Sequence, residues 1–192
     1  MPGKSVDKLA QAFTSVLAKI PNAKLVIVGD DDEKNLIMSY LKRFIRRHKL
    51  QEKLLLFQGQ FEIRKFHAVA DVFCYPAIGK GLSVMEAMAV EVPIVAKGTD
   101  KKPFVVEDKI SGLLTKDSSE LSAEENQLAD KLIYLLERPR VAKRMGKAGR
   151  IRIIKKFDFK KNIFGVLKVY HKTIKHYYKR PKDLYNYPSA TF

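Results

Sequence analysis

Residues 75–96 contain the pattern that decides the fold. Tyr75–Ala89 reads YPAIGKGLSVMEAMA, and Val92–Ala96 reads VPIVA. The spacing of apolar residues predicts a strand that Pro76 ends, a loop with two glycines, a helix over residues 82–89 and a second buried strand. This succession is typical of a parallel sheet, in which such a loop lies at the carboxyl ends of the strands, where ligands bind.

The loop before this helix suits a phosphate group. Gly79 and Gly81 allow the backbone to approach a ligand closely, and the free amides at the start of the helix suit an anion. Glu86 follows about one turn into the helix, where its carboxylate could accept hydrogen bonds from ribose hydroxyls. A glycine pair before a helix is a weak motif by itself, and the alternative is a tight turn followed by an exposed helical glutamate.

The same alternation extends along the chain in both directions. Short apolar runs predict further parallel strands, and segments with helical spacing of apolar residues separate them. From Ser122 to His176 the pattern is wholly helical. We therefore expect an α/β fold, a parallel sheet with helices on both faces, followed by C-terminal helices. The expected strands are 24–28, 54–57, 71–75, 92–96 and 112–114, and the expected earlier helices are 6–20, 31–49, 63–69 and 82–89.

Positive charge is concentrated towards the C-terminus. The 192 residues carry a net charge of +16, and residues 138–182 hold 17 Lys and Arg against Asp158 alone. The predicted organisation is a domain over residues 1–157, a basic amphipathic helix over 158–180 and an irregular tail over 181–192. Anionic partners for the basic segment are phosphorylated substrates, an anionic membrane surface or nucleic acid. The alternative is a solvated basic helical face.

Composition excludes several other classes of protein. Hydrophobic residues make up 46% of the chain and charged residues 30%, which is globular composition. No apolar run reaches the roughly 18–20 residues of a membrane span, and the first residues lack a signal peptide's apolar region. The single cysteine, Cys74, fits a reducing compartment, so we expect a cytoplasmic location. The histidines lack metal-ligand spacing and Asp30–Glu33 is interpreted as a helix start, so we expect no metal site.

Residues 79–96 resemble the nucleotide-sugar-binding half of GT-B glycosyltransferases, in the large retaining group called group 1 or family 4. The family has two glycines before Glu-Ala-Met-Ala and a Pro-Val-Val-Ala-like strand, which correspond here to Gly79, Gly81, Glu86–Ala89 and Pro93–Ala96. Further blocks match the family in the same order along almost the whole chain. These blocks are 4–13, 23–30, 70–73, 112–114 and 144–146 with Phe157.

The resemblance implies a specific activity. The fold would be the Rossmann-like C-terminal half of a hexosyltransferase that transfers a sugar from a nucleoside diphosphate to a glycan or a lipid-linked acceptor. Glu86 would bind the ribose as the catalytic residue, with no metal and no cofactor besides the nucleotide-sugar substrate. Because many members act on lipid-linked acceptors, a peripheral position at an anionic membrane also fits the basic segment. The remaining donor-binding residues implied are Lys4, Gly79, Lys80, Gly81 and Leu82.

Several positions depart from the family pattern. Ile78 and Phe104 stand where the family has glutamates near the donor sugar, Lys80 stands for a phenylalanine, and Glu91 stands for a glycine. These changes predict an altered donor preference or reduced activity. The alternative functions are therefore a degenerate, non-catalytic nucleotide-sugar-binding or partner subunit and, in another class, a basic module that binds membrane or nucleic acid.

The resemblance to the family is also incomplete at its N-terminal end. The chain begins after the point at which the family places the first strand of this half, and a sheet without that central strand would have unpaired edges. We therefore expect that a separate N-terminal half or a partner chain completes the enzyme, and that this chain alone does not transfer sugar efficiently.

Overall fold

The structure, a computed structural model, describes residues 6–29, 36–59, 62–77, 81–98, 105–116 and 121–178. The chain forms two compact units, residues 1–153 and 154–192. The helix start expected at residues 31–33 and the tail expected at residues 181–192 lie outside the described residues. These two units are defined by the contacts within the chain. The domain limits expected from the sequence stay a prediction.

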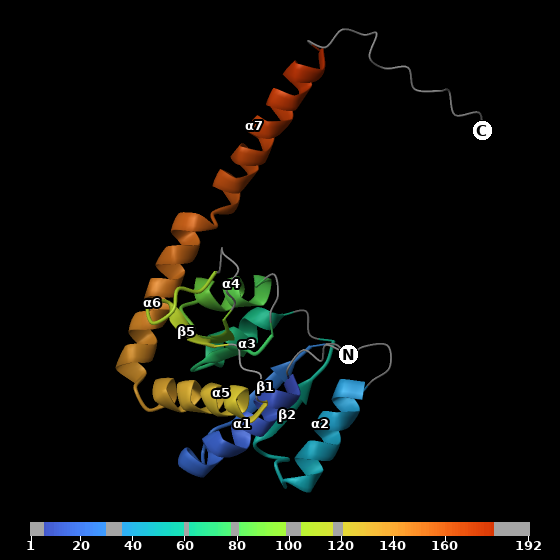
Figure 1. Cartoon of the computed structure of the whole chain (residues 1–192), viewed down its shortest axis with the longest axis vertical. Coiled ribbons are helices and arrows are strands. Elements are labelled where there is room, and N and C mark those ends of the chain that lie inside the picture. The colour runs from blue at the N-terminus through green and yellow to red at the C-terminus, as the bar shows by residue number, and fades with distance from the viewer. Residues whose placement is uncertain are drawn as a thin grey trace, which may run out of the picture. The chain divides into compact units, whose positions relative to one another are not determined.

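The first unit alternates helices and strands (Figure 1). Each strand and each helix that the sequence predicts within the described residues is present, with limits that differ by a few residues. The elements are α1 (Val6–Lys19), β1 (Leu25–Val28), α2 (Leu36–Arg47), β2 (Leu54–Phe57), α3 (Ile63–Val69), β3 (Phe73–Tyr75), α4 (Leu82–Ala89), β4 (Ile94–Lys97), β5 (Gly112–Thr115), α5 (Leu121–Leu136) and α6 (Pro139–Lys156), whose last residues belong to the second unit.

All strand pairs are parallel, but they form two sheets. β1 pairs with β2, and β4 lies between β3 and β5. The amides of Leu25 and Gly29 donate hydrogen bonds to the carbonyls of Lys53 and Phe57 at 2.8 and 3.1 Å. In a parallel pair of this kind, every second residue of β1 directs its N–H and C=O groups to the other edge of the strand. The sequence predicted one sheet. Among the described residues no strand pairs with both β1 and β3, and the sheet is therefore divided between them.

Strand β4 is buried on both of its faces. Val95 belongs to a cluster of apolar residues with α1 and α5, whereas Ile94 and Ala96 belong to a second cluster with α4. Successive side chains of a strand point to opposite faces, so the two clusters lie on the two sides of the sheet. This arrangement confirms the expected α/β fold with helices on both faces.

Helix α1 packs chiefly on α5, although about a hundred residues separate the two. Its apolar residues recur at helical spacing, and full burial of a Leu or Phe side chain stabilises a fold by about 1.5–3 kcal/mol. The residues that meet in this cluster are Leu9, Ala12, Phe13 and Val16 from α1 and Leu128, Ala129, Leu132 and Leu135 from α5.

Helix α6 approaches the turn after α4 at residues without large side chains. A Cβ atom added to Gly146 would lie 1.8 Å from the carbonyl oxygen of Glu91, and one added to Gly149 would lie 3.4 Å from Met88. Nearby, the Arg150 guanidinium donates a hydrogen bond to the Ala89 carbonyl. The position of α6 therefore depends on close backbone contact that only glycine permits at residue 146.

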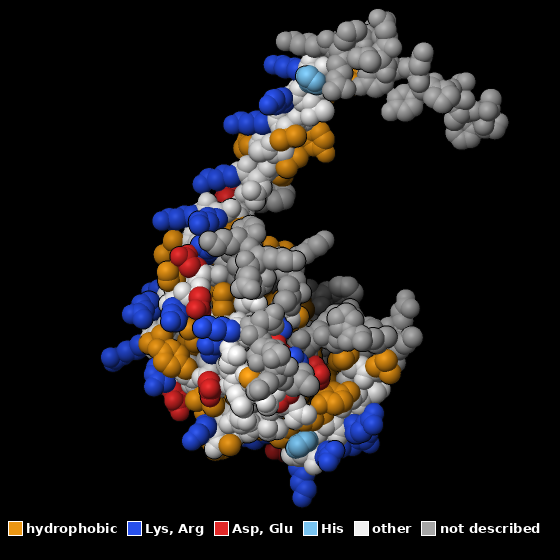
Figure 2. Space-filling view, viewed as in Figure 1, with side chains coloured by type: hydrophobic (Ala, Val, Ile, Leu, Met, Phe, Trp, Pro, Cys, Tyr) orange, Lys and Arg blue, Asp and Glu red, His pale blue; other side chains and the backbone are white. Residues whose placement is uncertain are grey.

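The second unit contains α7 (Phe159–Tyr178). Asp158 caps this helix, because its side chain accepts a hydrogen bond from the Lys161 amide at 2.9 Å. All described side chains from residue 160 to residue 178 are exposed. Figure 2 shows that the hydrophobic side chains of α7 gather mainly along one side of the helix and the lysines along another.

Candidate functional site

The candidate site is centred on the N-terminus of α4, which follows β3 at the carboxyl end of its sheet. Gly81 precedes the helix with φ 71° and ψ 15°, a left-handed conformation that favours glycine. Among the described residues, no side chain caps this end of the helix. The amides of the first turn therefore have no partner within the helix, and they carry the partial positive charge of the helix dipole.

Gly81 is also confined by its surroundings. It is buried, and a Cβ atom added to it would lie 3.2 Å from a methyl carbon of Val105. Both the backbone angle and the lack of space thus argue for glycine at this position. The left-handed Gly81 therefore sets the backbone direction at the start of α4.

Helix α4 has a buried apolar face and an exposed face. Val84, Ala87 and Met88 are buried in the cluster beneath the helix. Leu82 and Glu86, four residues apart and so on one face, are both exposed, Leu82 at 65%. The Glu86 carboxylate is therefore accessible to a ligand that reaches the N-terminal turn of the helix.

His67, on α3, is a buried neighbour of this site that the sequence did not indicate. It is 3% exposed, its ring contacts Phe73 edge to face at 5.1 Å, and its Nε2 atom has no hydrogen-bond partner in the described structure. Burial lowers the pKa of the ring, and the nearby Glu86 carboxylate partly opposes this effect. A histidine within an apolar pattern gives no signal by which to separate this position from a core residue.

A buried cluster of charged side chains lies at the carboxyl end of β4. Glu124, on α5, is 4% exposed and accepts hydrogen bonds from the ammonium groups of Lys8 on α1 and Lys97 on β4. Burial by itself would raise the pKa of Glu124, but the two lysines outweigh burial and hold it below its usual value. These three residues come from distant parts of the chain, so no local motif predicts the cluster.

Only part of the predicted donor site can be located. Lys4, Gly79 and Lys80 lie outside the described residues, as do Ile78 and Phe104, at which the sequence departs from the family pattern. Of the predicted residues, Gly81, Leu82 and Glu86 are brought together by α4. The roles of the others stay predictions.

The remaining reactive groups of the described structure offer no alternative catalytic centre. Burial raises the pKa of the Cys74 thiol to about 12, so this residue is a structural thiol and not a nucleophile at neutral pH. Within the described ranges, no three His, Cys, Asp or Glu side chains are grouped so that they could hold a metal ion.

No described helix is long and apolar enough to cross a membrane.

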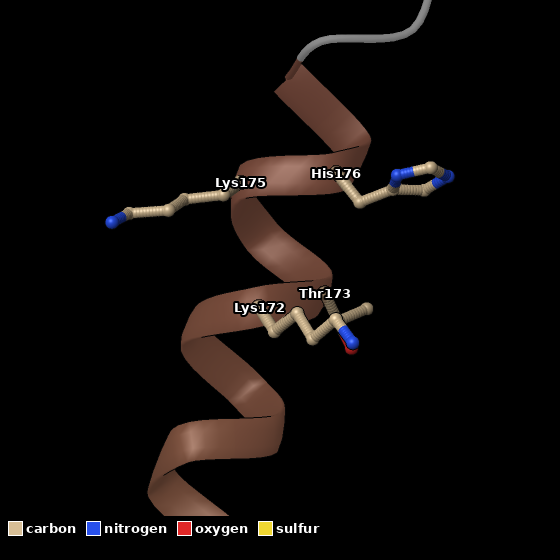
Figure 3. A pocket seen from close by; sticks show the side chains of 4 residues that line it. All are labelled: Lys172, Thr173, Lys175 and His176. Atoms are coloured by element: carbon tan, nitrogen blue, oxygen red, sulfur yellow. The ribbon is translucent and has the colours of Figure 1, made fainter.

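A surface hollow lies elsewhere, on α7 (Figure 3). Lys172, Thr173, Lys175 and His176 line it, and all four belong to this single helix. Lys175 and His176 project to opposite sides (Figure 3), so the hollow is an open helix surface and not an enclosed ligand pocket.

An open parallel sheet with an uncapped helix N-terminus at its carboxyl edge defines a class of α/β proteins that bind phosphate-containing ligands at this edge. The sequence matches, over residues 2–152, the family described as "Glycosyl transferases group 1". The chain belongs to this family of glycosyltransferases, as the resemblance at residues 79–96 indicated.

Two curated relatives differ in the reactions that their names describe. A trehalose synthase of Pyrococcus horikoshii is 28% identical over 173 residues, which cover 84% of this chain and 39% of the relative. A GDP-mannose-dependent alpha-(1-6)-phosphatidylinositol monomannoside mannosyltransferase of Mycolicibacterium smegmatis is 30% identical over 161 residues, or 78% of this chain and 40% of the relative. The chain thus spans about two-fifths of the length of these relatives.

A solved structure confirms the fold. The C-terminal domain of a group 1 glycosyl transferase, LpcC of Francisella tularensis, superposes with a TM-score of 0.70 at 22% identity. The match covers 81% of this chain and 80% of that domain. The expected Rossmann-like architecture of a GT-B C-terminal half is therefore the architecture of this chain.

Proposed function

We propose that this chain provides the donor-binding half of a glycosyltransferase that transfers a sugar from a nucleoside diphosphate to an acceptor. One observation carries the proposal: the uncapped first turn of α4 follows a buried, left-handed Gly81, and Glu86 is exposed one turn further along. Family membership supports it, and so does the name of the mycobacterial relative, which states dependence on GDP-mannose.

In the proposed complex the diphosphate lies against the first turn of α4. The amides there donate hydrogen bonds to phosphate oxygens, and the helix dipole favours their negative charge. Glu86 accepts hydrogen bonds from the ribose hydroxyls and thereby fixes the orientation of the nucleotide. Leu82 offers an apolar contact from the same exposed face. Lys4, Gly79 and Lys80 complete the site as predicted from the sequence.

The proposed transfer breaks the bond between the anomeric carbon and the diphosphate oxygen and forms a bond from that carbon to an acceptor hydroxyl. The hydroxyl proton is lost to solvent or to a base outside the described residues. The diphosphate leaves with additional negative charge, and amides that are already oriented stabilise this charge more than that of the ground state. We further propose that this role needs no metal ion and no cofactor besides the nucleotide sugar, because the helix amides and the lysines of the site supply the positive charge.

The acceptor that we propose is a glycan or a lipid-linked molecule. The mycobacterial relative is named for a phosphatidylinositol mannoside, whereas the Pyrococcus relative is named for trehalose, so the names support a class of hydroxyl acceptors and not one compound. We further propose a cytoplasmic protein that binds peripherally to membranes, and an N-terminal half or partner chain that contributes the acceptor site.

Two substitutions favour a second candidate function. Ile78 and Phe104 replace glutamates that the family pattern places near the donor sugar. A chain that retains Glu86 but lacks both carboxylates could bind a nucleotide sugar as a non-catalytic subunit. Donor binding without turnover, measured in the presence of the completing half, would support this second function over the first.

The test is a calorimetric titration of the purified chain with UDP, GDP and ADP and their sugar conjugates. We expect micromolar to millimolar binding of one nucleotide, which Glu86→Ala weakens about tenfold because two ribose hydrogen bonds are lost. Glu52→Ala removes a carboxylate that is also exposed, from a turn outside the site, and should leave binding unchanged. No binding to any nucleotide by a chain shown to be folded would contradict the proposal, as would equal effects of the two variants.

A further inference from the structure

Helix α7 has two chemically distinct faces that the proposed donor site does not use. At 100° per residue, four of its five aliphatic residues and two of its tyrosines project within about a third of the circumference, and four of its lysines project within about 60° on the opposite side. The apolar face consists of Ile163, Val166, Leu167, Tyr170, Ile174 and Tyr177. The lysine face consists of Lys161, Lys168, Lys172 and Lys175.

The apolar face of α7 is exposed along its whole length. The relative exposure of Ile163, Leu167 and Ile174 is 40%, 43% and 50%. Tyr170 and Tyr177, at 62% and 53%, continue the same face. An apolar surface of this extent on one helix is typical of a surface that contacts another molecule or a membrane.

The charge of α7 has a single sign. Residues 159–178 include five lysines and no Asp or Glu, and the carboxylate of Asp158 is used as the N-terminal cap of the helix. The lysines of α7 therefore have no acidic neighbours on their own helix to neutralise them. Their charge is complementary to an anionic surface, and it comes from lysine alone because α7 has no arginine.

An anionic lipid surface satisfies both faces at once. Interfacial helices have an apolar face that enters the headgroup boundary and a polar face rich in basic residues, often with aromatic residues at the boundary. Nucleic acid would neutralise the lysines but leave the isoleucines and leucine in water, so it would satisfy only one of the two faces. A protein partner would require acidic and apolar surfaces arranged in register with α7.

We propose that α7 is an interfacial helix that binds the surface of an anionic phospholipid bilayer. The aliphatic residues enter the boundary between headgroups and acyl chains, with Tyr170 and Tyr177 at headgroup level. The lysines remain in water and are attracted by the negative surface potential of the lipid. No residue of the two faces belongs to the proposed donor site, so this proposal and the donor site can fail independently.

The first experiment is sedimentation of the full chain with vesicles of phosphatidylcholine alone or with about 30 mol% phosphatidylglycerol. We expect at least tenfold stronger binding to the anionic vesicles, and a loss of binding as salt is raised from about 0.05 to 0.5 M because salt screens the lysines. Equal binding to both vesicles, or no binding to either, would overturn the proposal. Binding to duplex DNA as tight as to the anionic vesicles would overturn it too, since the charge would then be non-specific.

Two variants test the two faces of α7 separately. Leu167→Asn with Ile174→Asn removes apolar contacts, and Lys168→Gln with Lys172→Gln and Lys175→Gln removes three charges. Each should weaken binding to anionic vesicles at least tenfold. The matched controls are Val69→Asn with Ile110→Asn, and Lys109→Gln with Lys143→Gln and Lys147→Gln, which make the same changes at exposed positions of the first unit and should have effects below about threefold.

The outcomes of these variants exclude other occupants of α7. If the α7 variants behave as their controls do, another surface binds the lipid and the proposal is wrong. If the chain is an oligomer without vesicles and the apolar variant makes it monomeric, the face contacts a second copy and the proposal is equally wrong. Nucleotide titration of the same variants should give unchanged affinity, which separates this surface from the donor site.

A fluorescence measurement locates α7 at the lipid. The chain contains no tryptophan, so Tyr170→Trp places a single reporter on the apolar face. Its emission should shift to shorter wavelength with anionic vesicles. The control Tyr134→Trp, at a 40% exposed position of α5, should not shift. A shift of the control alone, or of neither, would contradict insertion of α7.

Discussion

Two consecutive helices, α6 and α7, carry most of the net positive charge of the chain, but their side chains have different surroundings. In α6, Arg152 donates to the Val105 carbonyl at 2.6 Å and pairs with Glu107 at 2.7 Å, and Arg150 donates to the Ala89 carbonyl. In α7, all described side chains after Phe159 are exposed, and residues 159–178 include no Asp or Glu.

The difference shows that a basic stretch of sequence need not be one functional surface. Arginines of α6 satisfy carbonyl groups and carboxylates of the first unit, so they contribute to its stability. Among the residues that the structure describes, the lysine side chains of α7 have no such hydrogen bond or ion pair, and they are available for an external anion. If α6 and α7 differ in this way, substitutions in α6 should lower the free energy of unfolding more than matched substitutions in α7.

Gly146→Val should have the largest effect. The new side chain would collide with the Glu91 carbonyl, because even its Cβ atom would lie 1.8 Å from that oxygen. We expect a loss of about 4 kcal/mol in the free energy of unfolding, near the upper end for overpacking, measured by urea denaturation. The control is Gly165→Val in α7, where nothing lies within 4 Å, and its effect should stay within about 0.5 kcal/mol. Equal losses for both variants would contradict the packing of α6.

Glu124→Ala should have the next largest effect, because it leaves Lys8 and Lys97 partly buried without their carboxylate partner. Removal of one member of a buried charged group typically lowers the free energy of unfolding by about 3 kcal/mol. Glu137→Ala, which removes a half-exposed pair with Arg138 at 3.5 Å, is the control and should change stability by less than about 0.5 kcal/mol. A Glu124 effect as small as that of Glu137 would show that the buried cluster does not form.

Arg152→Gln compares the two helices directly. It removes the guanidinium that bonds both Val105 and Glu107, and we expect a loss of about 2 kcal/mol from these charge-assisted hydrogen bonds. Lys172→Gln on α7 is the matched change and should leave the thermal midpoint unchanged. A loss of stability in the Lys172 variant would mean that α7 is anchored in the folded chain, as α6 is.

Substitution of His67 should have the smallest effect on the free energy of unfolding, and this effect should depend on pH. Its folded pKa lies below the ordinary value of 6.5, so protonation favours the unfolded chain and stability falls as the pH decreases through 6.5. Between about pH 7.5 and 6 this single group can contribute at most about 0.8 kcal/mol. His67→Phe should remove that part of the pH dependence, whereas His171→Phe on the exposed α7 should retain it. A wild-type chain whose stability is independent of pH in this range would contradict the burial of His67.

The predicted limits match the observed ones for some elements and are shifted for others. Residues 63–69 and 82–89 were predicted as helices and are α3 and α4 with the same limits, because a glycine or a polar loop precedes each apolar stripe. The strand predicted at residues 92–96 is observed at Ile94–Lys97. Pro93 has no amide for a ladder, although its carbonyl accepts from Phe73 at 3.0 Å. Short apolar runs therefore show that a strand exists but not where its pairing starts.

The site was only partly predictable for a related reason. Gly81 and Glu86 belong to one short stretch, and local spacing is sufficient to place both on the loop and helix that the structure shows. The cluster of Glu124 with Lys8 and Lys97 is assembled by packing of α1 and α5 across more than a hundred residues. No periodic pattern relates such positions, so only the folded structure reveals them.

The packing of α1 on α5 has a consequence for synthesis of the protein. Helix α1 leaves the ribosome before α5, and the leucines of α5 that cover its apolar stripe are translated more than a hundred residues later. Every strand pair is likewise parallel and closes through a crossover connection. The apolar stripe of α1 therefore stays exposed until α5 has emerged, and such transiently exposed surface favours aggregation.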